Sequence, residues 1–280
     1  LPGKAPAEAL GAALEEIDPP PTGIGVFEIE DGSGMWEVGA YFTESPDEIA
    51  LAILAAAHVA QPFVVSELPE TDWVAHVRRA LHPVEAGRFF VYGSHDADKL
   101  PEGRVGLHIE AAMAFGTGHH GTTQGCLEAF DALLSDGVKP ASVADIGCGT
   151  AVLAIAAAKE LPGSVIASDI DAVAVEVATA NAAANGVPDR VHCVEAAGFD
   201  HPDLDAAAPF DLVFANILKP PLIALAPDMA AHVAPGGTAI LSGLLTDQAA
   251  DVLAAYRAQG FDLMARRDLG EWATLTLKRV

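Results

Sequence analysis

The sequence predicts an α/β protein: a doubly wound, mostly parallel sheet preceded by a smaller α+β domain. Three observations support this fold class. Apolar runs and helical stretches alternate from residue 143 to the C-terminus. A glycine turn follows the first of these runs, and an acidic residue ends the next one. The chain has 280 residues, 51% of them hydrophobic, which suggests one large domain and a smaller one.

Residues 1–67 have their own helix and strand pattern. The expected elements are a helix over 5–17 ended by three prolines, strands over 24–30 and 35–42 around a hairpin turn, a helix from Ser45-Pro46 to about 58, and a strand over 63–66. This order is that of a ferredoxin-like domain without its first strand. We therefore expect a separate N-terminal domain.

Residues 68–84 are expected to form a linker helix. Thr71-Asp72 can cap an apolar stripe that runs to Leu81, and a proline follows. The larger domain is then expected to span residues 85–280. It opens with two short strands, over 88–92 and 105–109.

A glycine-punctuated stretch runs from Ala114 to Thr123 and contains three glycines and three threonines. Adaptable backbone and short hydroxyls are typical of a loop that wraps a small polar ligand. A helix is expected from about Thr122, so Thr123 can place its hydroxyl against a carboxylate. His119 and His120 do not predict a metal site, because adjacent residues rarely chelate one ion and no third ligand is near. We expect His120 to order the loop.

The central motif is a GxG turn at Gly147 and Gly149, between the apolar run 143–146 and an apolar helix. Its glycines allow close approach to a ligand, and the helix N-terminus offers unpaired N–H groups. Asp169 follows Gly147 by 22 residues and ends a second buried run. A carboxylate there can accept both ribose hydroxyls of a nucleotide. The third glycine of the dinucleotide motif would stand at Val152, so this spacing leaves the nucleotide open.

Beyond Asp169 the alternation continues. Helices are expected over 171–185, 221–233 and 247–259, and strands over 191–195, 210–218, 237–244, 261–269 and 272–278. In a doubly wound sheet, ligands lie off the carboxyl ends of the strands. We expect Thr123, Gly147, Asp169 and Asn216 to share that edge.

Composition limits the partners. The net charge is −24, with only 15 Lys and Arg residues, which argues against DNA binding or any extended nucleic-acid footprint. Two interpretations of this acidity stay open: the protein binds a cationic partner, or the charge only keeps it soluble. Three cysteines without CxxC spacing predict neither a disulfide framework nor a zinc site. The longest apolar stretch, 49–60, is too short to span a bilayer, and no signal-type segment opens the chain. We expect a cytoplasmic protein.

Several motifs occur together in the order and spacing of one known family. They are Phe115-Gly116-Thr117-Gly118 with Thr123, Asp145-Ile146-Gly147-Cys148-Gly149, Asp169-Ile170-Asp171, Ala215-Asn216-Ile217-Leu218, Ala234-Pro235-Gly236-Gly237, Leu241-Ser242-Gly243 and Glu271-Trp272. From about Trp73 onward the chain resembles PrmA, the bacterial S-adenosylmethionine-dependent methyltransferase of large-subunit ribosomal protein L11. The resemblance implies a class I (Rossmann-like) methyltransferase fold, that cofactor and that substrate.

The resemblance also implies cofactor contacts at Thr123, Gly147, Asp169 and Asn216, and we expect Asp145 and Gly149 of the same turn to take part. The chain departs from the family pattern at a few positions. Ala151 stands where many members have a third glycine, Ala111-Ala112 where an acidic residue and proline are usual, and Gly121 where proline is common. Glu195 is the nearest candidate for an acid at the adenine ring, and it can equally be a solvated strand end.

The implied reaction is N-methylation of lysine side chains, α-amino groups, or both. Such an amine must be neutral to attack, so we expect a neutral acceptor beside it instead of a carboxylate. The Asn216 amide oxygen and the Ile217 carbonyl are the expected catalytic groups. Two alternatives remain at this point: a nicotinamide-dependent oxidoreductase and a noncatalytic S-adenosylmethionine-binding partner protein. We expect the N-terminal domain to recognise the substrate and the protein to be a monomer.

Overall fold

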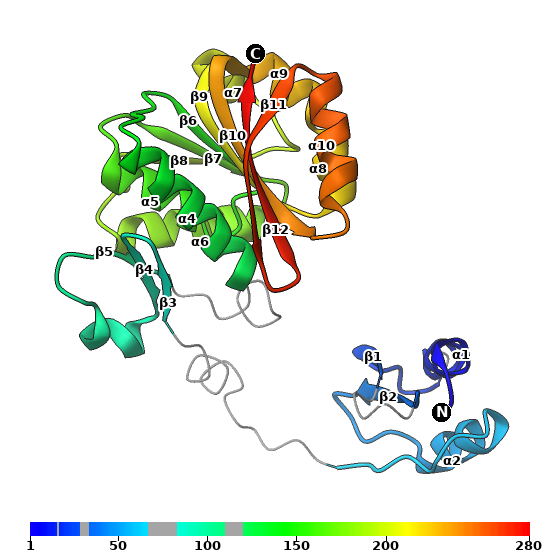
Figure 1. The fold of residues 1–280 in the computed structure, drawn as a ribbon. Coiled ribbons are helices and arrows are strands. Elements are labelled where there is room, and N and C mark those ends of the chain that lie inside the picture. Colours follow the sequence, from blue (N-terminus) through cyan, green and yellow to red (C-terminus); the bar gives the residue numbers. More distant parts are fainter. Residues whose placement is uncertain (16, 29–33, 67–82, 110–119) are drawn as a thin grey trace. The chain divides into compact units, whose positions relative to one another are not determined.

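The computed structural model describes residues 1–15, 17–28, 34–66, 83–109 and 120–280 (Figure 1). The chain divides into two compact units, Leu1–Thr71 and Asp72–Val280. The expected linker helix and the stretch from Ala114 to His119 lie outside the described residues, apart from the last two linker positions, so both stay predictions.

The N-terminal unit contains two helices and a two-stranded antiparallel sheet: α1 (Lys4–Leu14), β1 (Gly23–Glu28), β2 (Trp36–Tyr41) and α2 (Glu48–Ala57). Its core is formed by Leu10, Leu14 and Leu51. Leu1 exchanges two backbone hydrogen bonds with Trp36, of 2.7 and 2.9 Å. In an antiparallel pair, the N–H and C=O groups of one residue point to the same side of the strand. Both groups of Trp36 point to Leu1, so Leu1 lies along the edge of β2 that β1 does not occupy.

The strand expected over 63–66 is wrong, since these residues have no regular secondary structure. Phe63 packs its side chain against the leucine core, whereas Val64 is 93% exposed. A four-residue apolar run does not distinguish a paired strand from an extended segment anchored by one side chain.

The larger unit is built on a seven-stranded sheet of order β11-β12-β10-β9-β6-β7-β8. The strands are β6 (Val143–Ile146), β7 (Val165–Asp169), β8 (Val191–Glu195), β9 (Phe210–Asn216), β10 (Val233–Leu245), β11 (Phe261–Leu269) and β12 (Trp272–Arg279). Strands β6 to β10 are parallel, and β11 and β12 form an antiparallel closing pair. This confirms the predicted doubly wound sheet.

Helices cover both faces of this sheet (Figure 1). One face carries α4 (His120–Ser135), α5 (Val152–Glu160) and α6 (Ala172–Ala184); the other carries α7 (Pro202–Ala207), α8 (Lys219–Ala224), α9 (Ala226–His232) and α10 (Ala249–Ala258). The strands between them are buried on both sides, which explains their continuous apolar runs. Within the described part of the chain, no helix is long and apolar enough to cross a membrane.

Two details of this half differ from the sequence prediction. The single helix expected over 221–233 is two helices, α8 and α9, which meet at Leu225. Pro227 explains the break, because it has no N–H to continue the hydrogen-bond pattern of α8. The short helix α7 was also not expected. Elsewhere in the chain, the sequence prediction missed a 3₁₀ helix, η1 (Ser94–Lys99).

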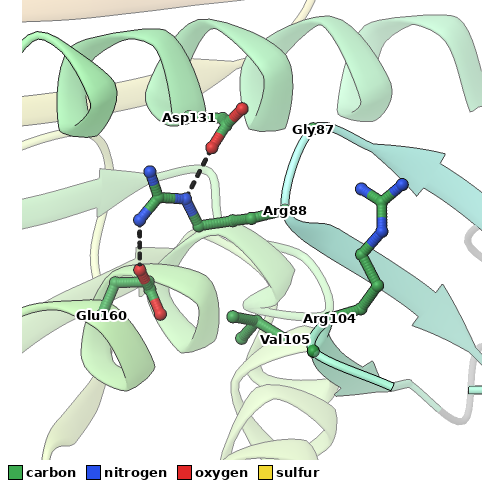
Figure 2. Close-up of a pocket in the computed structure, with 7 residues that line it drawn as sticks. Gly87, Arg88, Arg104, Val105, Asp131 and Glu160 are labelled. Atoms are coloured by element: carbon green, nitrogen blue, oxygen red, sulfur yellow. Dashed lines mark hydrogen bonds and ion pairs between the residues drawn. The ribbon is translucent and has the colours of Figure 1, made fainter. Parts of the chain in front are cut away.

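A three-stranded sheet, β3 (Val84–Ala86), β4 (Phe89–Tyr92) and β5 (Val105–His108), is attached to the helices of the first face. Figure 2 shows the Arg88 side chain reaching Asp131 of α4 and Glu160 of α5, at 2.5 and 2.7 Å. Asn185 bonds to both backbone groups of His108, at 3.0 and 2.6 Å. These contacts fix the strand that leads into the glycine-rich stretch.

Candidate functional site

The strand register places three predicted site residues at one edge of the sheet. Ile146, the last residue of β6, lies beside Ser168 of β7 and Ala215 of β9. The next residues of the three segments are therefore Gly147, Asp169 and Asn216. All three are at least partly accessible at the carboxyl edge, where doubly wound sheets bind ligands.

The glycine turn has a backbone that few other residues adopt. Gly147 and Gly149 have φ of 70° and 53°. The N–H groups of Gly147 and Cys148 donate to the Ser168 carbonyl at 2.8 and 2.9 Å, which ties the turn to β7. A Cβ on Gly149 would have no atom within 4 Å, so this residue borders open space.

Ala151 ends the turn with φ of 58° and is fully buried at the start of α5. The third glycine of the family pattern is thus replaced by a residue in the left-handed region, which costs roughly 1 kcal/mol for a non-glycine residue. Its methyl group packs in the core cluster of the first face. The departure affects helix packing and leaves the open side of the turn unchanged.

Asp169 is joined to this turn. Its Oδ2 accepts a hydrogen bond from the Gly149 N–H at 2.8 Å, and its Oδ1 accepts one from the Asp171 N–H at 3.1 Å. Each carboxylate oxygen can accept more than one hydrogen bond. The half-exposed carboxylate is therefore oriented by the backbone and can still accept two hydroxyl donors.

Asp145 has a different environment. It is 1% exposed, and its Oδ2 accepts a hydrogen bond from the Ala154 N–H in the first turn of α5 at 3.0 Å. Burial, with a smaller contribution from Asp169, raises the pKa of Asp145 to about 7, although the Ala154 bond lowers it. Asp145 thus joins β6 to α5 beneath the turn. Direct contact with a cofactor stays a prediction for this residue.

The segment after β9 is held between two glycines. A Cβ on Gly147 would overlap the Ile217 side chain, and one on Gly243 would lie 2.7 Å from the Ile217 carbonyl carbon and 2.8 Å from its nitrogen. Gly243 has φ of 83° and belongs to β10, whose Ser242 pairs with Asn216. Both neighbours must be glycine for Ile217 to occupy this position, so the peptide after Asn216 has a fixed place beside the turn.

Helix α4 approaches the same edge through two further glycines. A Cβ on Gly121 would lie 2.9 Å from the Trp272 ring, and one on Gly125 would overlap the Thr274 hydroxyl. The Thr274 hydroxyl lies 3.0 Å from that of Ser242, beside Asn216. The first turns of α4, which contain the buried Thr123, are therefore packed on β12.

The sequence motifs at Ser242-Gly243 and Glu271-Trp272 had no assigned role before the structure. Gly243 positions Ile217, and Trp272 occupies the space that a glycine leaves at the start of α4. A glycine inside a buried strand, as at Gly243, was the one sequence signal for close backbone approach. Nothing in the local sequence indicated which segment Gly243 or Trp272 would meet.

Comparison with known proteins decides the family. A family model described as Ribosomal protein L11 methyltransferase (PrmA) matches residues 7–280. This chain belongs to the PrmA family. Curated relatives of the same name include a protein of Brucella suis, which is 45% identical; the match covers 91% of this chain and 89% of the relative. A relative of Bradyrhizobium diazoefficiens is 46% identical, and the match covers 92% of this chain and 88% of the relative.

A crystal structure of the ribosomal protein L11 methylase from Lactobacillus delbrueckii subsp. bulgaricus has the same fold. The two sequences are 29% identical and the TM-score is 0.62; the match covers 71% of this chain and 98% of the Lactobacillus chain. The predicted class I methyltransferase fold is confirmed. This PrmA chain is an S-adenosylmethionine-dependent methyltransferase, so the oxidoreductase alternative is wrong.

The described residues of the PrmA site fit the cofactor. The carboxylate of Asp169 is oriented to accept ribose hydroxyls, and the space at Gly149 leaves room for a ligand against the turn. The methionine part has a polar carboxylate, which helix N-termini and short hydroxyls can bind. Thr123 therefore stays the predicted partner of that carboxylate.

Among the residues with described positions, no group of three His, Cys, Asp or Glu is placed to hold a metal ion. The hollow beside Arg88, Arg104 and Val105 in Figure 2 is also not the PrmA site. Asp131 and Glu160 on its wall stand near the C-terminal ends of α4 and α5. The site lies at the other ends of these helices.

Proposed function

We propose that this chain methylates amino groups of ribosomal protein L11, on lysine side chains, α-amino groups or both. The observation that carries the proposal is the Asn216-Ile217 segment, which two glycines fix beside the cofactor turn. It offers an amide oxygen and a backbone carbonyl without adding a carboxylate. This is the chemistry that a neutral nucleophilic amine requires.

The amine must lose its proton before it reacts. A lysine with pKa 10.4 is neutral only about once in 2,500 molecules at pH 7, a cost of roughly 4.6 kcal/mol, whereas an α-amino group near 7.8 costs about 1 kcal/mol. A carboxylate beside the amine would favour the charged form. Asn216 and Ile217 can accept its N–H bonds without that penalty and orient the lone pair.

S-adenosylmethionine, when bound, supplies an electrophilic methyl group on a sulfonium. Asp169 and the glycine turn hold the nucleoside part, and Thr123 the carboxylate. In this proposal Asn216 and Ile217 orient the amine nitrogen toward the methyl group. The methyl group would pass from the sulfonium to the amine nitrogen that these residues orient, and the surplus proton of the product ammonium would go to solvent.

We further assign residues 1–67 to substrate recognition, 68–84 to a linker and 85–280 to methyl transfer. The cofactor motifs all fall in the last part, and the N-terminal unit has its own core. A net charge of −24 suits a basic ribosomal partner and opposes self-association, which supports a monomer acting in the cytoplasm without binding DNA.

The proposal is tested by incubating the purified chain with S-adenosylmethionine and unmethylated L11 from the same organism. We expect mass spectrometry to find added methyl groups on amines of L11, and none without the cofactor. A noncatalytic binding protein would bind the cofactor in calorimetry and leave the mass of L11 unchanged, and that result would refute the proposal.

A further inference from the structure

The sheet of the N-terminal unit has two different faces. Side chains alternate along each strand, so Ile24 and Val26 of β1 share a face with Val38 and Ala40 of β2. Ile24, Val38 and Ala40 pack against the leucine core of α1 and α2. The opposite face is formed by the alternate residues, and we call it the glycine-aromatic face: Gly23, Gly25, Phe27, Glu37, Gly39 and Tyr41.

Three of these six residues are glycine, so only three side chains project from this face. Gly25 lies opposite Gly39, with Phe27 opposite Glu37 at one end and Tyr41 opposite Gly23 at the other. The Phe27 ring lies over Gly25, because a Cβ on that residue would overlap ring atoms Cε2 and Cζ. The Phe27 ring thus covers Gly25, whereas a Cβ on Gly39 would meet no described atom within 4 Å, so the face is open at Gly39.

Both rings remain accessible in the described unit: Phe27 is 58% exposed and Tyr41 54%. Both rings lie on the side of the two-stranded sheet that faces away from α1 and α2, and apolar side chains that are exposed together mark interaction sites. Residues 1–66 contain eleven acidic residues, one lysine and no arginine. Glu37 adds an exposed carboxylate to the face itself, and none of its six residues is basic.

We propose that the glycine-aromatic face docks a lysine- or arginine-bearing segment of the protein substrate. Cationic side chains can stack over the rings of Phe27 and Tyr41, their aliphatic stems can lie against the open backbone at Gly39, and Glu37 can pair with one of them. An acidic or purely apolar partner would leave Glu37 and the surrounding charge uncompensated. The inference rests on the proposed function for the identity of the substrate.

The first test is the double variant Phe27→Ser/Tyr41→Ser. Its matched control is Ile49→Ser/Ile53→Ser, which also removes two exposed apolar side chains, 73% and 62% accessible, from α2. Helix α2 packs on the other face of the sheet through Leu51. We expect the first variant to weaken binding of intact L11, measured by calorimetry, at least tenfold, and to raise KM by the same factor. The control variant should change the L11 binding constant and the KM less than threefold.

Two readouts separate docking from folding. The double variant should keep its S-adenosylmethionine affinity and its kcat/KM on a short lysine peptide, which lacks the docking segment of L11. Unchanged binding of intact L11 would overturn the inference. So would a parallel loss of peptide methylation and melting temperature, because the face would then be an internal packing surface.

A charge variant keeps the test independent of the aromatic residues. Glu37→Lys places a cation on an exposed strand position, and it should weaken L11 binding most at low salt, where charges are least screened. A binding constant that does not change with this substitution at low salt would contradict the inference. If the unmodified chain binds L11 but transfers no methyl group, the proposed function fails, and these binding measurements still decide the docking face.

Discussion

Asp145 of β6 and Asp169 at the end of β7 belong to neighbouring strands but lie in different environments. Asp169 is partly exposed and accepts hydrogen bonds from two backbone N–H groups, whereas Asp145 is buried and accepts a hydrogen bond from one. The first can accept hydrogen bonds from a ligand, while burial raises the pKa of the second to about 7. The sequence pattern around Gly147 indicated that both are near the turn. It did not separate their roles, because both follow equally apolar residues.

The buried carboxyl predicts a pH-dependent stability. The pKa of Asp145 is about 7 in the folded chain against about 3.8 in the unfolded chain, so the folded state binds the proton more tightly. Stability from this group is complete below about pH 4 and is lost as pH rises to 7, on the order of 4 kcal/mol in total.

Asp145→Asn keeps an acceptor for Ala154 but cannot ionise. Between pH 4 and pH 8, the free energy of urea unfolding should therefore fall more in the unmodified chain than in this variant. Taking the difference between the two proteins removes the contribution of all other titrating groups. Parallel pH curves would show that the pKa of Asp145 is not raised.

At the scale of elements, the site depends on where the end of β9 meets β10. Gly243 lies at a register shift between Leu241 and Leu244, and its positive φ lets the strand pass the Ile217 backbone. Alternation of strands and helices predicts which strands end at this edge. It cannot predict this contact, since the two residues approach only after the strands have paired.

Gly243→Ala should displace the Ile217 peptide and reduce turnover by about 10²-fold, the scale for a misplacement of roughly 1 Å. Cofactor affinity should change less, because Asp169 belongs to another strand. Gly236→Ala is the control: it has a similar φ, 76°, but no atom within 4 Å of the added Cβ. If both variants lose turnover equally, backbone strain explains the effect and positioning of Ile217 does not.

At the scale of the whole molecule, the chain has two units with separate cores, Leu1–Thr71 and Asp72–Val280. The larger fold was predictable, because buried parallel strands and their crossover helices repeat regularly over many residues. The smaller unit was predicted less well. Its two helices and its hairpin formed near the predicted positions, whereas the strand expected at 63–66 did not form, because a four-residue apolar run does not show whether it will find a pairing partner.

A fragment beginning at Val84 tests the division of labour. It contains the sheet and every described cofactor residue, so it should bind S-adenosylmethionine with nearly unchanged affinity. It should lose methylation of intact L11 while retaining weak activity on a short lysine peptide, since only docking energy is removed. Calorimetry and methyl incorporation measure the two properties. Full activity on intact L11 would exclude recognition by the N-terminal unit.

The central claim is that cofactor binding and amine positioning are separate functions of two strand ends on either side of β6, carried by Asp169 of β7 and Asn216 of β9. The direct measurement compares Asn216→Ala with Asp169→Ala, by cofactor calorimetry and single-turnover methylation of L11. Asp169→Ala should weaken S-adenosylmethionine by about 2 to 4 kcal/mol through lost charge-assisted hydrogen bonds.

Asn216→Ala should lower the single-turnover rate at saturating cofactor by about 10² to 10³, the scale for one preorganised polar group. Its cofactor affinity should fall less than that of Asp169→Ala. A single-turnover rate within about threefold of the unmodified chain would contradict the account, because the amine would then be held by other residues.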